Sequence, residues 1–135
     1  MKGNYKKGPD NVWTIHLYEA YKREMSARVR RHWKWIKTLL EDSLSPRQRT
    51  HLLRRATKDQ VLAVSEVVKN LLEGHMDLDP SDQAKLFRYK NAYRRLAQSQ
   101  DRLPWGERRT LLVKYSKPLI LLLNVIKDQV EDLLQ

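Results

Sequence analysis

Apolar side chains recur every three to four positions along most of this chain, which is the spacing of one face of an α-helix. The pattern is clearest over residues 58–73, where Val61, Val64, Val68 and Leu71 share one face. Few segments show the alternation of apolar and polar residues that is typical of a strand. The pattern therefore predicts an all-α fold, a compact helical bundle of about five to six helices.

Capping signals divide this pattern into separate helices. Ser45, Thr57 and Asp79 each stand directly before a helical stretch and predict helix N-termini, and Gly74 predicts a helix end. The predicted helices cover residues 12–42, 46–55, 58–73, 80–99, 104–115 and 118–135. Residues 1–11 are expected to form a flexible basic N-terminus, and residues 12–135 a single helical domain.

The first and the last predicted helix each leave a choice open. In the first, the apolar stripe from Trp13 to Leu40 drifts around the helix, so the helix either wraps past several neighbours or breaks near Ser26. A continuous helix is favoured. In the last, the stripe follows nearly two heptads, which suits packing inside the chain or against a second copy. The stripe is therefore a candidate oligomer interface, formed by Leu119, Leu122, Ile126, Val130 and Leu133.

The charge of the chain is large and unevenly distributed. With 27 Lys and Arg residues against 16 Asp and Glu residues, the net charge is +11. Residues 1–57 hold 14 basic and 5 acidic residues, and residues 85–118 hold 10 and 2, whereas the segments 58–84 and 119–135 are acidic. A positive field of this size attracts polyanions. The two basic regions either form one phosphate-binding face or meet acidic segments of another copy during assembly.

Basic residues of the first, second and fourth predicted helices are the candidate contacts to phosphate. They interleave with Trp33 and Trp35, which point about 200° apart on a helix. Trp33 continues the apolar stripe and is expected in the core, whereas Trp35 lies among cations and is expected at the surface, against a base, a membrane or a protein. The predicted nucleic-acid contacts are Arg28, Arg30, Arg31, Lys34, Trp35, Lys37, Arg54, Arg55, Arg88, Arg94 and Arg95.

The sequence contains no arrangement of residues that is typical of an enzyme. It has no cysteine, and its four histidines lack metal-ligand spacing, so no catalytic residue, metal or other cofactor is predicted. Asp59, near the start of the helix at 58–73, would repel phosphate, which argues against sequence-specific reading by a helix-turn-helix. The absence of cysteine and of a signal peptide favours an intracellular location, nuclear or cytoplasmic, or the interior of a virion.

Several stretches from residue 44 onward resemble a known family. "LSPRQRTHLLRRATKDQVLAVSEVVKNLLEG" has a Leu-Leu-x-x-Ala motif before an apolar helix, "LDPSDQAKLFRYKNAYRRLAQ" a basic helix ending Leu-Ala, and "ERRTLLVKYSKPLILLL" a basic segment before an apolar tail. This series resembles small basic proteins of Polinton (Maverick) transposons and adintovirus-like elements over residues 44–126. The chain departs from their pattern at "YSKPLIL", where they have a Gly-Gly-Phe-Leu stretch. The resemblance implies a virus- or transposon-derived, virion-associated protein.

These features predict a non-enzymatic protein that binds nucleic acid without sequence specificity, by neutralising phosphates. The alternative is a structural, self-assembling helical module of the minor capsid or scaffold type, with a second copy or a capsid protein as its partner. A membrane surface is a less favoured partner, because the second basic region favours an extended polyanion surface over an isolated patch around Trp35.

Overall fold

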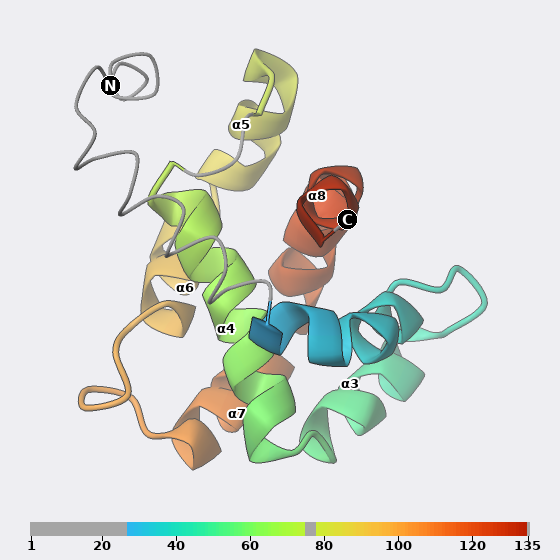
Figure 1. Ribbon diagram of the computed structural model, residues 1–135, viewed down its shortest axis with the longest axis vertical. Helices are drawn as coiled ribbons and strands as arrows, with labels where there is room; N and C mark the ends of the chain where they lie inside the picture. Colours follow the sequence, from blue (N-terminus) through green and yellow to red (C-terminus); the bar gives the residue numbers. More distant parts are fainter. Residues whose placement is uncertain (1–26, 75–77, 135) are drawn as a thin grey trace.

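Seven α-helices make up the regular structure of residues 27–74 and 78–134, the part of the chain that the computed structural model describes (Figure 1). Helix 27–39 is followed by α3 (Pro46–Arg54), α4 (Lys58–Leu72), α5 (Pro80–Phe87), α6 (Lys90–Leu96), α7 (Trp105–Lys114) and α8 (Ser116–Leu134). Within residues 27–74 and 78–134 there is no strand, and the predicted all-α fold is confirmed. The expectations for residues 1–26, including the continuity of the first helix, lie outside the described residues.

Local hydrogen bonds explain where three of the helices begin. The Ser45 hydroxyl accepts from the backbone N–H of Gln48 at 3.1 Å, and the Gln48 side chain accepts from the backbone N–H of Ser45 at 2.7 Å. Thr57 and Gln60 make the same reciprocal pair at the start of α4. The Asp79 carboxylate caps α5 by accepting a backbone N–H at 2.9 Å. All three predicted N-termini are therefore confirmed.

Two helix ends have separate causes. Gly74 follows α4 with a φ of 80°, a left-handed conformation that favours glycine, and the predicted stop is confirmed. Helix 27–39 ends three residues before the predicted end at 42. Arg49 of α3 donates to the carbonyl oxygens of Leu39 and Glu41, both at 2.8 Å, and so satisfies acceptors that a helix C-terminus leaves without partners.

The helix predicted over 80–99 is in fact two helices, and that part of the prediction is wrong. α5 ends at Phe87 and α6 begins at Lys90, with the backbone N–H of Tyr89 donating to Leu86 only three residues back. The physical reason is packing. α5 lies against α8, whereas α6 lies against α4, and one straight helix could not reach both neighbours.

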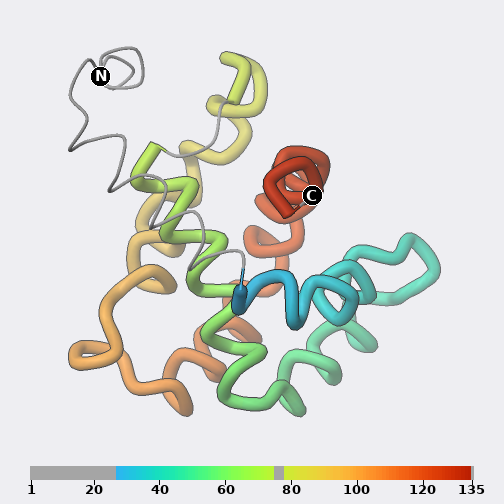
Figure 2. The backbone as a smooth tube through the Cα atoms, in the orientation of Figure 1, coloured from blue at the N-terminus to red at the C-terminus, as the bar shows by residue number. Residues whose placement is uncertain are grey.

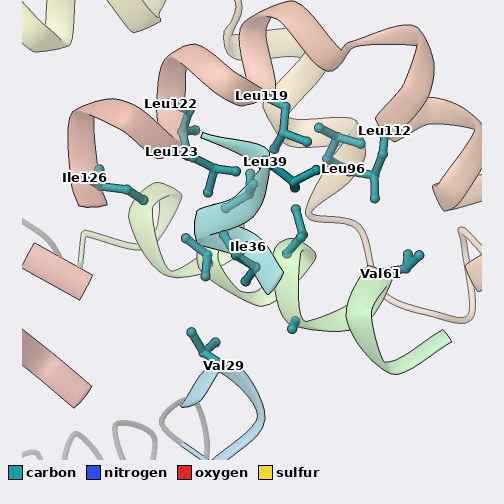
Figure 3. Packing of buried hydrophobic residues seen from close by; sticks show 14 of the residues in the cluster. Val29, Ile36, Leu39, Val61, Leu96, Leu112, Leu119, Leu122, Leu123 and Ile126 are labelled. Carbon is teal, nitrogen blue, oxygen red and sulfur yellow. The ribbon is translucent and has the colours of Figure 1, made fainter. Parts of the chain in front are cut away.

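α4 lies at the centre of the core. Its residues 61–65, 67, 68 and 70 are all buried, and it contacts both α6 and α7. Helix 27–39 begins beside α4 and runs away from it in Figure 2, and it contributes Val29, Ile36 and Leu39 without exposed surface. In Figure 3 the α8 leucines gather with Leu39 and Leu96, so one cluster joins these helices.

Arg108 of α7 is buried in this core with 1% of its surface exposed. One guanidinium nitrogen, Nη1, donates to the Ser65 hydroxyl at 3.0 Å and to the Leu96 carbonyl at 2.6 Å. The other, Nη2, donates to the Leu103 carbonyl at 2.8 Å. No carboxylate of the described residues pairs with it, and burial lowers its pKa. Arg108 therefore joins α4, α6 and the loop before α7 through uncharged acceptors.

Candidate polyanion-binding site

Two of the predicted phosphate contacts, Arg28 and Arg31, are paired with acids of the same chain. Arg28 Nη1 lies 2.8 Å from Glu66 Oε1, and Arg31 Nη2 lies 3.1 Å from Asp59 Oδ2, both on α4. Asp59 also lies 3.3 Å from Arg28 Nε and 2.7 Å from His32 Nε2. The acid that was expected to repel phosphate therefore holds helix 27–39 against α4, and it reduces the charge available to a ligand.

These hydrogen bonds make stability depend on the ionisation of Asp59. The bond from His32, followed by that from Arg31, holds the pKa of Asp59 below its usual 3.8. The contribution of ionised Asp59 to the free energy of unfolding is therefore complete above pH 3.8. It is lost as the pH falls through the lower pKa that Asp59 has in the folded state. Because the pair is half exposed, we expect Asp59→Asn to lower the free energy of unfolding by about 0.5–1 kcal/mol near neutral pH. That difference should shrink in acid.

Urea unfolding from neutral pH to below 3.8 measures this effect. Asp42→Asn is the matched control, because Asp42 is exposed and forms no ion pair with any residue between 27 and 134 that the structure describes. Its stability should follow that of the unsubstituted chain at every pH. A difference for Asp59→Asn that stays constant with pH would contradict the ionisation argument.

Lys37, another predicted contact, is held by α8. Its Nζ lies 2.9 Å from Glu131 Oε2, and the indole N–H of Trp33 donates to the same oxygen at 3.2 Å. These two interactions lower the pKa of Glu131. Trp33 is buried, as predicted. Trp35 is half-buried against the core, so the expected surface position is only partly correct, because Trp35 lies one turn before buried Leu39.

The other predicted cations are free to meet a ligand. All are exposed, and none of them forms an ion pair within residues 27–74 and 78–134. They are Arg30, Lys34, Arg54, Arg55, Arg88, Arg94 and Arg95. They occupy more than one place on the molecule, since α6, which carries Arg94 and Arg95, and α3, which carries Arg54, lie on opposite sides of α4 in the view of Figure 1.

One of these cations, Arg54, lines an open hollow between α3 and α7, which we call the basic hollow. The hollow has a volume of about 510 Å³. Its lining is three cations, one hydroxyl and one apolar side chain, with no acid: Arg54, Arg109, Thr110, Val113 and Lys114. A hollow lined by guanidinium and ammonium groups without a carboxylate suits an anion, and phosphate oxygens accept well from both groups.

Arg109 is held in place within the basic hollow. Its Nη1 donates to the Ala56 carbonyl at 3.2 Å, which links α7 to the turn after α3. Its guanidinium carbon lies 5.0 Å from the centre of the Trp105 ring, within cation–π range. A half-buried, stacked guanidinium with unused N–H groups loses little conformational freedom when it binds a phosphate.

Arg109 and Lys114 are absent from the residues predicted as contacts. Both belong to the basic region 85–118, but nothing in the sequence pairs them with Arg54. A local signal does exist, because Arg109 and Val113 are four residues apart and share one flank of a helix. That spacing does not show that Arg54 of α3 lies beside them, because the position of α3 against α7 depends on tertiary packing.

The predicted oligomer interface on α8 is the inner face of the helix. Leu119, Leu122, Ile126 and Val130 have no exposed surface, and Leu133 is half-buried. A side chain that is fully covered by its own chain cannot contact a second copy. The prediction of an exposed seam is therefore corrected, and the heptad spacing reflects packing inside the chain.

α4 has no free face with which to enter a DNA groove. It is the second helix of the pair that resembles a helix-turn-helix, and its middle is buried on nearly every side. At the N-terminus of α4, Asp59 forms ion pairs with Arg28 and Arg31 of helix 27–39. Burial of α4 adds to the argument from Asp59 against reading of bases by this helix.

The described residues contain neither a candidate membrane span nor a candidate metal site. No helix there combines the length and the apolar content that crossing a bilayer requires. No group of three or more acidic or histidine side chains there lies close enough to hold a metal ion.

Comparison with known proteins gives no relative for this chain. No family model, no curated protein and no solved structure matches it.

Proposed function

We propose that this chain is a non-enzymatic protein that binds nucleic acid through its phosphates, without sequence specificity. The basic hollow between α3 and α7 carries the proposal, because three cations from two helices line it and no acid does. Phosphate contacts fix a protein on a nucleic acid but read no sequence. The exposed, unpaired cations of helix 27–39 and of α6 provide further contacts along a backbone.

The resemblance to small basic proteins of Polinton transposons and adintovirus-like elements supports a setting for this binding. A protein that neutralises phosphates without reading bases suits a nucleic acid that is packed inside a virus-like particle. We therefore propose virion-associated nucleic acid as the ligand and the interior of such a particle as the location.

Binding of duplex DNA as a function of salt concentration tests the proposed function. Each neutralised phosphate releases counterions, so the logarithm of the affinity should fall linearly with the logarithm of salt, by about 0.9 per phosphate contact. Light scattering on the same samples reports whether the free protein is a single chain. Duplexes of unrelated sequence should bind equally. Absence of binding at low salt, or a strong preference for one sequence, would contradict the proposal.

A further inference from the structure

Phe87, the last residue of α5, is an exposed aromatic ring. With 64% of its surface exposed, it is the more exposed of two large apolar side chains at the surface of the described part of the chain, the other being Leu72. The neighbouring Tyr89 is half-buried and packs edge-on against Tyr93, with ring centres 6.4 Å apart. Tyr89 and Tyr93 therefore belong to the core, whereas the ring of Phe87 is open to a ligand.

A cation lies over one face of this ring. Lys90 Nζ lies 4.3 Å from the centre of the Phe87 ring. An ammonium group at that distance is attracted by the ring electrons and limits the movement of both side chains. The ring is thus held beside a positive charge.

The surroundings of Phe87 are strongly basic. Residues 83–100 contain five basic residues and no Asp or Glu: Lys85, Arg88, Lys90, Arg94 and Arg95. Lys90 and Arg94 are four residues apart on α6, so their side chains lie on the same flank of that helix. Lys85 lies 3.8 Å from the Asp82 carboxylate, whereas the α6 cations Lys90, Arg94 and Arg95 form no ion pair with any acid among the described residues.

We propose that Phe87 is a stacking platform for an unpaired base, and that single-stranded nucleic acid is a ligand of this end of the molecule. This inference rests on the proposed function. A single strand offers bases for the ring and phosphates for the cations next to it, which is the combination that proteins without sequence preference use. A duplex hides the faces of its bases. A protein partner is less favoured, because four cations with no ion pair among the described residues, Arg88, Lys90, Arg94 and Arg95, suit a regular row of phosphates better than a mixed protein surface.

Binding of a short single strand, of the corresponding duplex and of a single strand of abasic sugar-phosphate tests the inference by fluorescence anisotropy. We expect Phe87→Ala to weaken binding of the normal single strand by about five- to 150-fold, the range that loss of one stacked base gives. Duplex binding should be unchanged. The unsubstituted chain should bind the abasic strand more weakly than the normal single strand, by a similar factor. Phe87→Ala should bind the normal and abasic strands equally.

Phe87→Leu and Phe87→Trp are the matched controls. Leucine keeps an apolar side chain without a ring, so it should behave like alanine, and tryptophan should restore binding. Since Phe87 is largely exposed, these variants should keep the helical circular dichroism of the parent.

Wild-type affinity in Phe87→Ala or Phe87→Leu, with duplex binding intact, overturns the inference and leaves the proposed function standing. A fall in light-scattering mass on Phe87→Ala would identify a protein contact instead. If the parent chain binds neither strand nor duplex at low salt, both proposals fail.

Discussion

Arg108→Ala is expected to lower the free energy of unfolding by about 3–5 kcal/mol. The substitution removes a fully buried side chain and three hydrogen bonds, and it leaves the Leu103 carbonyl without the donor it has in the fold. Leu96 keeps one donor, because the Ser65 hydroxyl lies 2.8 Å from its carbonyl oxygen. Since small domains are stable by only about 5–15 kcal/mol, this variant should be close to unfolding. Urea unfolding followed by circular dichroism measures the change.

Arg102→Ala is the matched control for Arg108→Ala. Arg102 is an arginine in the loop before α7, but it is exposed, so its loss should change stability by less than about 0.5 kcal/mol. Arg108→Lys separates charge from geometry. A lysine keeps the positive charge but is a point donor that cannot reproduce the two-nitrogen fork toward Leu96 and Leu103. If Arg108→Lys were as stable as the parent, the fork would have no structural role and the argument would fail.

Replacing the three cations of the basic hollow by glutamine should reduce the salt dependence of duplex binding. Loss of three phosphate contacts lowers the slope of log affinity against log salt by about 2.7. Between about 50 and 200 mM salt, the affinity of the variant should therefore change about 40-fold less than that of the parent. The substitutions are Arg54→Gln, Arg109→Gln and Lys114→Gln. Salt titrations of a labelled duplex measure both slopes.

A second triple variant separates the basic hollow from net charge. Arg28→Gln, Arg31→Gln and Lys37→Gln remove the same number of positive charges, but these cations are paired with acids of their own chain. Their loss should destabilise helix 27–39 and leave the slope nearly unchanged. Equal slopes for the two triple variants would show that binding follows the total charge of the chain, and the basic hollow would lose its assigned role.

The parts of the fold that depend on neighbours in the sequence could be predicted. The reciprocal pair of Ser45 and Gln48, the same pair at Thr57, and the left-handed Gly74 each involve residues within a few positions of one another, and the sequence pattern located all of them. The break after Phe87 was not predictable in this way. No glycine or proline marks it, and its cause is that α5 and α6 pack against different helices.

The candidate site depends more on tertiary contacts, and prediction was correspondingly weaker. The charge of Arg28, Arg31 and Lys37 is evident from the sequence, but their pairing with α4 and α8 is not. A sequence shows that a cation is present, whereas only the fold shows whether an acid lies beside it.

Arg108 and Arg109 illustrate the same limit within one helix. They are adjacent and identical in type, yet the first is buried and the second lines the basic hollow. Arg108 does lie three and four residues before the buried Leu111 and Leu112, which places it on the apolar face. That spacing predicts burial. A prediction from hydrophobic pattern alone nevertheless places an arginine at the surface, because charged residues are rarely buried.

The link between α3 and α7 also couples binding to folding. Arg109 and Ala56, which are joined by a hydrogen bond, are 53 residues apart in the sequence, so the basic hollow exists only in the folded chain. A ligand that binds only the folded state shifts the folding equilibrium by RT ln(1 + [L]/Kd). If a polyanion binds in the basic hollow as proposed, it is a folding ligand. On the proposed function, the resistance of this protein to heat or urea would be a property of the complex and of the surrounding salt, and a chain packed with nucleic acid would be more stable than the same chain alone.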